Sequence, residues 1–429
     1  MKYEIINSDL FKSNRKNYAE FLKPESIAIF VSNDIFPTNA DGTMPFKQNS
    51  DLFYLSGIDQ EETTLVVCPD YYNHNYQEML FVKETNEHIA VWEGNKLTKK
   101  EVSERSGISS VYWTSEFESI VSVIIPECKN IYLNANEHSR ASKTLDTKQD
   151  KFIEWCKKNF PLHNYERSAP IMHKLRAVKS PLEIALIQKA CNITEKAFKR
   201  VLEFVKPNVA EYEIEAEILH EFIRNRSRGP AYAPIIASGK NACILHYTEN
   251  SGTCKDGELI LMDIGAEYAN YASDLTRTIP VNGKFSPRQK EVYEAVLRVL
   301  KKATSMLEVG NNLIDYHKEV GKLMESELIG LGLLNKEDIA KQDPNKPLYK
   351  KYFMHGTSHY LGLDVHDVGA RNRPFESGMV FTCEPGIYIR EEGIGIRLEN
   401  DILITKDGPV NLMKNIPIEI EEIESLMNQ

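Results

Sequence analysis

The 429-residue sequence contains no hydrophobic run of membrane-spanning length, and residues 1–15 lack the apolar centre of a signal peptide. Its seven cysteines are odd in number and form no CxxC pair, a pattern that favours a reducing compartment over a disulfide framework. Basic residues are not in excess: the net charge is −10, whereas a general nucleic-acid binder needs clustered Lys and Arg. We therefore expect a cytoplasmic protein with no membrane and no nucleic-acid partner.

The chain is too long for one ordinary hydrophobic core, so we expect two domains, residues 1–172 and 173–429. The first part alternates short apolar, β-prone runs with polar helical segments, which indicates a mixed α/β domain. The apolar runs lie at residues 26–32, 64–68 and 79–82, and a helix is expected over 98–105 with Thr98 as its N-cap. No ligand cluster or nucleophile motif stands out there, so we interpret this domain as structural, serving oligomerisation and shaping substrate access.

The second part begins with strong helix signals. Ser180, Pro181 and Glu183 combine an N-cap, a proline at the first helical position and a capping-box acid. The helix must end before Pro207, and a second helix is expected over 211–225. The pattern then changes to strands at 259–264 and 272–281, which predict a β-hairpin.

The same order of elements then repeats. A second capping box at 286–289 starts a helix to about residue 307, and another helix follows over 313–329. Strands are expected at 358–365, 379–384 and 394–405. Two helices followed by strands, twice over, suggest that residues 173–429 form two related halves.

Four acidic residues lie in strongly apolar strand contexts, where an isolated carboxylate is costly to bury. Asp263 occurs in LILMDIG and Asp274 in ASDLTRT, across the predicted hairpin, while Glu384 occurs in MVFTCEPG and Glu399 in GIGIRLEND. Close, unpaired carboxylates repel one another, and a divalent cation would remove that conflict. A turn Asp, a solvated strand Asp and a simple ion pair with Arg397 remain the alternatives.

A histidine-rich segment, FMHGTSHYLGLDVHDVG, holds His355, His359 and His366. The spacing of the first two resembles the HExxH zinc motif, but Gly356 stands where that motif has its glutamate, and the glycine-rich setting is not helical. A neutral imidazole among oxygen ligands suits Mn, Fe, Co or Zn. The four carboxylates carry four negative charges, which two divalent ions bound by them and one His would balance. A pair of such ions can bind a bridging hydroxide that carries out hydrolysis.

The series LMDIG, SDLTRT, HGTSH, CEPG and RLEND resembles the pita-bread metallopeptidases, the family of methionine aminopeptidase, prolidase and aminopeptidase P. The run QNSDLFYLSGIDQEETTLVV is similar to the N-terminal domain of the aminopeptidase P branch. The resemblance implies a mixed α/β (α+β) protein, in which a creatinase/aminopeptidase P-like domain precedes a pita-bread catalytic domain with pseudo-two-fold halves.

Carried over by position, the resemblance implies the metal ligands Asp263, Asp274, His359, Glu384 and Glu399. Asp274 and Glu399 would bridge two ions, Asp263 would chelate one, and His359 and Glu384 would bind the other. Glu384 would also be the general base. The ions would be divalent, with Mn²⁺ favoured and Co²⁺, Zn²⁺ or Fe²⁺ as alternatives.

Further residues are implied to contact the substrate. His246 and His366 would hydrogen-bond the substrate and the developing oxyanion, and His355 would lie on the side that accepts proline. The pocket would be completed by Tyr232, Tyr388, Arg397 and Arg371. Arg373 is the second candidate for the role of Arg371, because the loop after His366 is short. Without the resemblance, each of these would be read as an ordinary core or surface residue.

The implied activity is hydrolysis of the bond between an N-terminal residue and a following proline, in peptide substrates. A prolidase restricted to dipeptides, and a catalytically silent binding protein, are the alternatives. The N-terminal domain argues against a methionine aminopeptidase, and the complete ligand set argues against metal-free, creatinase-type hydrolysis. Relatives assemble through the N-terminal domain, so a homodimer or homotetramer is expected.

Overall fold

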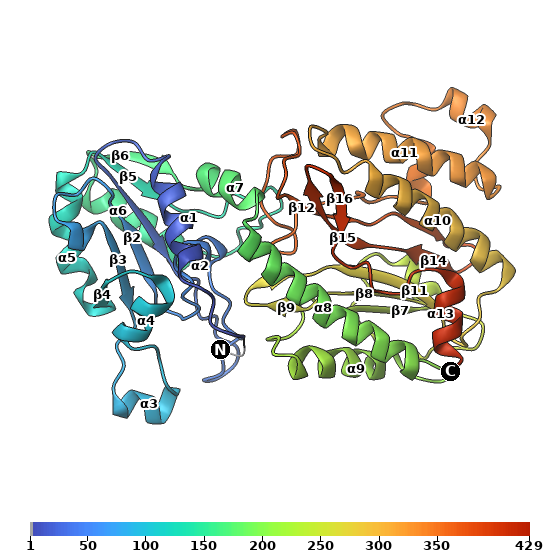
Figure 1. Ribbon diagram of the computed structural model, residues 1–429, viewed down its shortest axis with the longest axis horizontal. Coiled ribbons are helices and arrows are strands. Elements are labelled where there is room, and N and C mark those ends of the chain that lie inside the picture. Colours follow the sequence, from blue (N-terminus) through green and yellow to red (C-terminus); the bar gives the residue numbers. More distant parts are fainter. Residues whose placement is uncertain (1–2) are drawn as a thin grey trace. The chain divides into compact units, whose positions relative to one another are not determined.

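The computed structural model describes residues 3–429 and consists of two compact units, Tyr3–Arg176 and Ala177–Gln429. The first unit is built on a six-stranded mixed sheet in the order β4-β3-β2-β1-β5-β6 (Figure 1). Its strands are β1 (Ser26–Val31), β2 (Thr64–Val67), β3 (Glu78–Val82), β4 (Ser110–Trp113), β5 (Asn130–Leu133) and β6 (Asn164–Arg167). The predicted runs at 26–32, 64–68 and 79–82 are therefore confirmed as strands, to within a residue at their ends.

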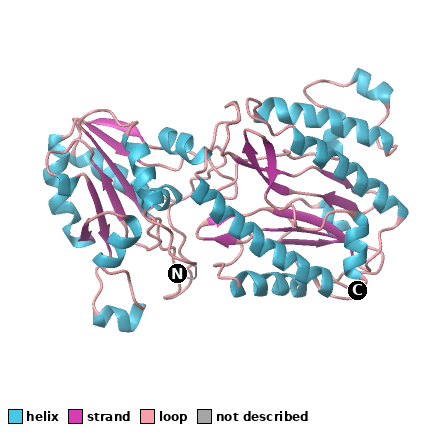
Figure 2. Cartoon of the chain, in the orientation of Figure 1, coloured by secondary structure: helices cyan, strands magenta, loops and turns pink. Residues whose placement is uncertain are grey.

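The first unit also contains α-helices, most of which lie beside the sheet (Figure 2). They are α1 (Asp9–Ala19), α2 (Ser50–Ser56), α3 (Glu87–Glu93), α4 (Lys99–Ser106), α5 (Phe117–Ile124), α6 (Lys148–Asn159) and α7 (Ala169–Ala177). Helix α4 begins where the sequence predicted, because Thr98 and Glu101 form a capping box. It ends at Gly107, whose φ of 73° is a left-handed conformation that glycine adopts without strain.

The second unit holds strands between two pairs of long helices (Figure 1). Its helices are α8 (Pro181–Phe204), α9 (Glu211–Arg224), α10 (Pro287–Ser305), α11 (Leu313–Gly330), α12 (Lys336–Lys341) and α13 (Ile420–Met427). Helices α8 and α10 both begin with the predicted capping box and a proline at the first position. The apolar face of each is buried.

The strands of the second unit form small antiparallel sheets, with orders β11-β8-β7 and β12-β15-β16 and the pairs β9–β10 and β13–β14. They are β7 (Ile235–Ser238), β8 (Leu259–Ile264), β9 (Glu267–Tyr268), β10 (Tyr271–Ala272), β11 (Leu275–Pro280), β12 (Val380–Cys383), β13 (Gly386–Ile389), β14 (Ile394–Arg397), β15 (Asn400–Thr405) and β16 (Gly408–Asn411). The order helix, helix, strands is thus repeated along the chain. Hydrogen bonds join the two repeats, as from Glu399 N to Thr276 O at 3.0 Å.

Three strand predictions need correction. Residues 358–365 are a loop with a single isolated bridge between Tyr360 and Phe381, because the backbone bonds to several segments and not to one strand. Tyr360 O accepts from Asp367 N (2.9 Å), whereas Gly362 O accepts from Ala272 N (2.8 Å). The segment 394–405 is two strands in different sheets, and 272–281 is interrupted between β10 and β11. The two interruptions lie at Asp274 and Glu399, two of the acidic residues predicted to bind metal.

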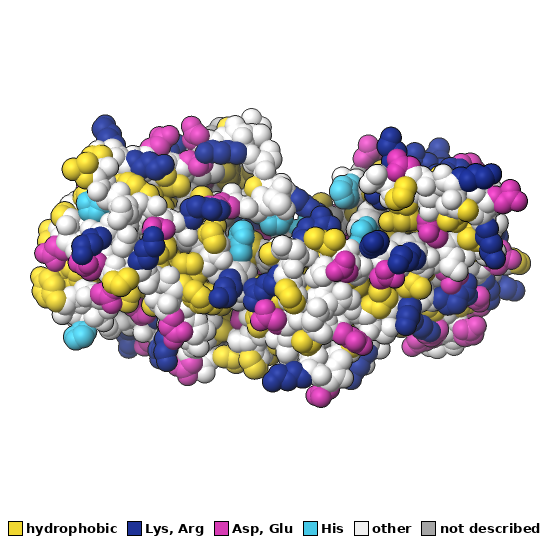
Figure 3. All heavy atoms as spheres, turned by 90° about the horizontal axis from the view of Figure 1, so that it is seen from above, with side chains coloured by type: hydrophobic (Ala, Val, Ile, Leu, Met, Phe, Trp, Pro, Cys, Tyr) yellow, Lys and Arg dark blue, Asp and Glu magenta, His cyan; other side chains and the backbone are white. Residues whose placement is uncertain are grey.

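The surface carries charge of both signs. Acidic and basic side chains are interspersed over the face shown in Figure 3. Among the helices of residues 3–429, none combines the length and the apolar character needed to cross a bilayer.

Candidate metal centre

The hairpin of β8 and β11 places two carboxylates on one face. Asp263 pairs with Thr276, and Asp274 lies two residues before Thr276, so both acids point to the same side of the pleat. The two arms of the hairpin approach closely at Gly265, where an added Cβ would lie 1.9 Å from the carbonyl oxygen of Ser273. A glycine is therefore required for the two strands to approach so closely.

The second repeat supplies the remaining candidate ligands from strand ends and one loop. Glu384 follows β12, and Glu399 lies between β14 and β15. His359 is held against β12 by two hydrogen bonds, from its N to Thr382 Oγ1 (3.1 Å) and from Thr382 N to its carbonyl oxygen (3.0 Å). The backbone of Glu384 is fixed in the same way, since its N donates to Thr357 O at 2.9 Å.

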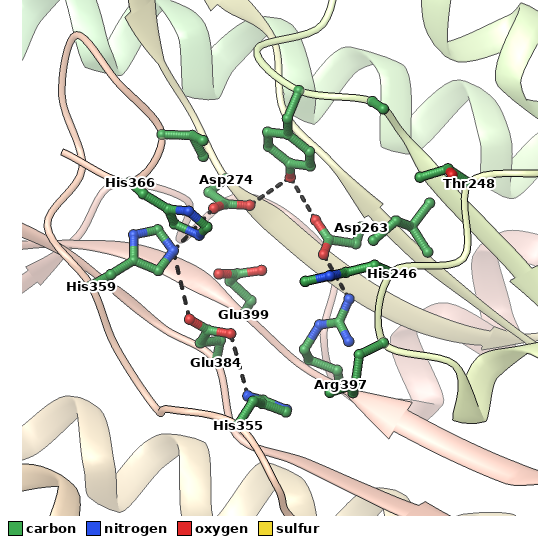
Figure 4. Close-up of a pocket in the computed structure, with 15 residues that line it drawn as sticks. His246, Thr248, Asp263, Asp274, His355, His359, His366, Glu384, Arg397 and Glu399 are labelled. Carbon is green, nitrogen blue, oxygen red and sulfur yellow. Dashed lines mark hydrogen bonds and ion pairs between the residues drawn. The ribbon is translucent and has the colours of Figure 1, made fainter. Parts of the chain in front are cut away.

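These side chains converge on one cavity of about 300 Å³. Asp274, His359 and Glu399 each offer a ligand atom within 4.8 Å of the others. Nε2 of His359 lies 3.5 Å from Asp274 Oδ2 and 3.6 Å from Glu384 Oε1. Figure 4 shows the four carboxylates directed toward a common space, with the His359 ring beside them.

Most of the sequence-predicted site residues line this cavity. They are Tyr232, His246, Asp263, Asp274, His355, His359, His366, Glu384, Arg397 and Glu399. Tyr388 lies behind the wall, where its hydroxyl contacts His355 Nε2 (2.8 Å) and accepts a hydrogen bond from Arg397 Nη1 (2.8 Å). Arg371 is exposed and does not line the cavity, and Arg373 is paired with Glu376 at 2.7 Å.

Tyr232 makes an unusual pair of contacts. Its hydroxyl lies 2.6 Å from Asp263 Oδ1 and 2.5 Å from Asp274 Oδ1. A phenol has one proton, so it can donate to only one of the two carboxylates. The contact with the second carboxylate requires either that this carboxyl group carries a proton, or that a bound cation attracts both Asp263 and Asp274.

The electrostatics of the cluster point to cations. Burial raises the pKa of Asp263 and of Glu399, and it raises the pKa of Glu384 to about 7. Burial opposes the charged form of His359, yet hydrogen bonding to Asp274 and the charge of Glu384 raise its pKa to about 9. Arg397 is the one Arg or Lys among the described residues that line the cavity. Divalent cations would supply the missing positive charge, so this donor set fits them.

Sequence reasoning missed a further buried acid, Asp401. Its Oδ2 accepts hydrogen bonds from Asp274 N (3.0 Å) and Cys191 Sγ (3.4 Å). The side chain is fully buried, and its Oδ1 has no hydrogen-bond partner within residues 3–429. The signal was present, because Asp401 follows Glu399 by two positions at the start of the apolar strand β15.

Comparison with known proteins identifies the family. Residues 185–406 match metallopeptidase family M24, and residues 11–132 match the aminopeptidase P N-terminal domain. The chain is 36% identical to the Xaa-Pro aminopeptidase of Escherichia coli (strain K12), over 98% of each protein. It is similar to the structures of E. coli aminopeptidase P in complex with substrate and of the Zn-substituted enzyme in complex with product, each with a TM-score of 0.88, 35% identity and 99% of both chains covered.

These likenesses extend over nearly the whole chain and confirm the predicted fold class, an aminopeptidase P-like α/β domain followed by a pita-bread domain. The chain belongs to metallopeptidase family M24 and carries in addition the N-terminal domain found in aminopeptidase P.

Proposed function

We propose that this protein is an Xaa-Pro aminopeptidase, which hydrolyses the bond between the first residue of a peptide and a following proline. The observation that carries the proposal is the convergence of Asp263, Asp274, His359, Glu384 and Glu399 on one cavity. The five residues occur in a chain whose full-length relatives are named Xaa-Pro aminopeptidases.

The five residues would hold two divalent cations, with Mn²⁺ as the proposed native metal and Co²⁺, Zn²⁺ or Fe²⁺ as substitutes. Such ions polarise a scissile carbonyl and lower the pKa of water. Support comes from the chemistry of the donors, which are four carboxylates and an imidazole with too few cationic neighbours to balance them. Asp274 and Glu399 are buried, and the other three are half-buried. Asp274 and Glu399 are proposed to contact both ions, Asp263 one, and His359 and Glu384 the other.

The chain's own groups have distinct proposed tasks. Glu384 accepts the proton of the attacking water, a role that its place on the cavity wall, 3.6 Å from Nε2 of His359, permits. His246 and His366, both on the cavity wall, hydrogen-bond the substrate and the oxygen on which charge develops. Arg397 holds Asp263 in place through its 2.6 Å contact from Nη2 to Oδ2.

The proposed proline site is the aromatic corner around His355. Its ring meets Tyr388 at a centroid distance of 5.5 Å and Phe353 at 4.8 Å, both edge to face. Burial and then the charge of Arg397 lower the pKa of His355 to about 3, so its imidazole is neutral at physiological pH. A neutral, flat surface suits a pyrrolidine ring, which has no N–H to satisfy.

Three predictions about the whole chain remain, besides that for Arg371. The first is the division into residues 1–172 and 173–429, with oligomerisation and substrate access assigned to the first part; the two compact units support the division. The second is a homodimer or homotetramer. The third is a cytoplasmic location, which rests on the cysteine pattern of the sequence. Arg371 stays a proposed contact for the far end of a peptide.

The deciding experiment strips the protein with chelator, restores Mn²⁺, and measures free alanine released from Ala-Pro-Ala, Ala-Pro and Ala-Ala-Ala. Metal-dependent cleavage of Ala-Pro-Ala, with Ala-Ala-Ala left intact, is the expected result. Cleavage of Ala-Pro alone would make the protein a prolidase. No release with Mn²⁺, Co²⁺ or Zn²⁺ would contradict the proposal and leave a binding protein.

A further inference from the structure

One side chain of the cavity wall, the imidazole of His246, has no anchor of its own at the cavity. The segment 239–252 brings Leu245, His246 and Thr248 to the wall. His246 is exposed, and its ring makes no hydrogen bond or ion pair with another residue of the described chain 3–429. The place of the imidazole is therefore set by the backbone of the loop, and whatever holds the loop also holds His246.

The loop packs around a buried carboxylate that belongs to helix α9. Glu211, the first residue of α9, has no exposed surface. Its Oε1 accepts hydrogen bonds from Ser238 N (2.7 Å), Ser238 Oγ (2.7 Å) and Asn241 Nδ2 (3.2 Å). Its Oε2 accepts from Tyr247 OH (2.8 Å) and Gly252 N (2.7 Å). One side chain thus bonds to the start, the middle and the end of the loop.

The fit around this carboxylate is close. A Cβ added at Gly252 would lie 2.9 to 3.0 Å from the Glu211 carboxylate, and Glu211 N donates in return to Gly252 O at 2.9 Å. No Lys, Arg or His of residues 3–429 forms an ion pair with Glu211, so its negative charge is stabilised by donors of the loop and by the helix N-terminus on which it sits.

We infer that Glu211 is a positioning residue for hydrolysis: through Tyr247 and the ends of the loop, it fixes His246 and Thr248 at the cavity. The inference rests on the proposed function, because it assumes that His246 contacts the substrate. Tyr247 is buried and adjacent to His246, so its bond to Glu211 restrains the backbone next to the imidazole. A shift of about 1 Å in a reacting group can lower a rate by roughly 100-fold.

The informative variant is Glu211→Gln, which preserves the size of the side chain. All five contacts of Glu211 are with donors, so the amide NH₂ of Gln would face an N–H or O–H group. Tyr293→Phe is the control for the loss of a buried side-chain hydrogen bond elsewhere in the domain, because the Tyr293 hydroxyl donates to Ile418 O at 2.7 Å outside the loop.

The test is a double-mutant cycle of Glu211→Gln and His246→Ala on full-length, Mn²⁺-loaded protein, with Ala-Pro-Ala as substrate. We expect Glu211→Gln alone to lower kcat by about 10- to 100-fold, but by less than about threefold when His246 is already Ala. Tyr293→Phe should leave kcat within about twofold. Equal losses from Glu211→Gln in both backgrounds would overturn the inference.

A readout that does not depend on turnover separates this inference from the proposed function. Hydrogen exchange of peptides covering residues 239–252 should accelerate at least about tenfold in Glu211→Gln. Peptides covering residues 355–369, and the bound Mn²⁺ per chain, should be unchanged. Unaltered exchange in 239–252 would contradict the inference. An inactive wild-type protein with accelerated exchange in the variant would instead contradict the proposed function and retain the loop anchor.

Discussion

The guanidinium of Arg397 lies 2.6 Å from the carboxylate of Asp263, and both residues are enclosed at the proposed metal centre. Arg397→Ala would leave Asp263 without this partner and held only through Oδ1, by the hydroxyl of Tyr232 (2.6 Å). Because a residue that supports a metal ligand typically contributes 10- to 100-fold in affinity, we expect Mn²⁺ affinity to fall by about that factor. Calorimetric titration of the chelator-stripped protein measures it.

A surface ion pair provides the control for Arg397. Arg288 contacts Glu392 at 2.8 Å, but both side chains are about one-third exposed. Exposed pairs contribute less than about 1 kcal/mol. Arg288→Ala should therefore bind Mn²⁺ as the wild type does, and an equal loss in both variants would show that the Arg397 effect is not specific.

Glu384→Ala removes both a proposed ligand and the proposed general base. Since a positioned base typically contributes about 10²- to 10⁴-fold, we expect Ala-Pro-Ala turnover to fall by at least 100-fold. Steady-state release of alanine checks this, with circular dichroism as the control for folding. Activity within tenfold of the wild type would contradict the two-metal mechanism.

Asp274→Asn tests the proposed bridging position with almost no change in shape. The amide carries no negative charge, so the cluster should lose metal as well as turnover. Mn²⁺ per chain after dialysis, measured by atomic emission, should fall below that of the wild type by at least one equivalent. A variant that keeps full metal content would remove Asp274 from the ligand set.

Gly265→Ala should destabilise the fold through the hairpin that carries Asp263 and Asp274. The new methyl would lie 1.9 Å from Ser273 O, a backbone atom that cannot rotate away. Overpacking of this kind costs about 1–3 kcal/mol. Urea unfolding measures the loss, and Gly330→Ala is the control, because a Cβ there would meet nothing within 4 Å.

The ionisation of Glu211 should make the free energy of unfolding depend on pH. Burial opposes its ionisation, but hydrogen bonds from Ser238, Tyr247 and Gly252 outweigh burial and lower the pKa of Glu211 below its usual value. An acid with a lowered folded-state pKa stabilises the fold above its unfolded pKa of about 4.3, and that contribution disappears as the pH falls through the folded-state value. Gln cannot titrate.

The free energy of unfolding of the wild type should therefore exceed that of Glu211→Gln by a constant amount above about pH 5.5, and the difference should shrink below about pH 4. Urea unfolding at a series of pH values measures it. A difference that grows on acidification would contradict the predicted ionisation of Glu211.

Much of this fold could be predicted from local signals. Ser180 and Ser286 mark the two long helices because a capping box and a proline act within one turn, independent of the rest of the chain. Asp263 and Glu399 could be singled out because an acid in an apolar strand needs a partner or a cation.

Other features depend on distant contacts and could not be predicted. The loop 358–365 has the apolar, β-prone composition of a strand, yet its backbone bonds to a local turn, to β12 and to β10 in place of a single partner strand. Tyr232 gave no sign in the sequence that its hydroxyl meets Asp263 and Asp274, 31 and 42 residues away. Glu211 is one of several acids on an amphipathic helix, and its donors lie 27 to 41 residues further on.

The two repeats meet at the proposed metal centre: Thr276 Oγ1 donates to Glu399 Oε2 at 2.7 Å, and Asp274 N donates to Asp401 Oδ2 at 3.0 Å. A chain still missing the segment from His359 onward has only two of the five proposed ligands. High-affinity metal uptake would therefore come late in folding, after the repeats have docked, and would stabilise only the completed domain. During synthesis, metal occupancy would then distinguish finished molecules from fragments.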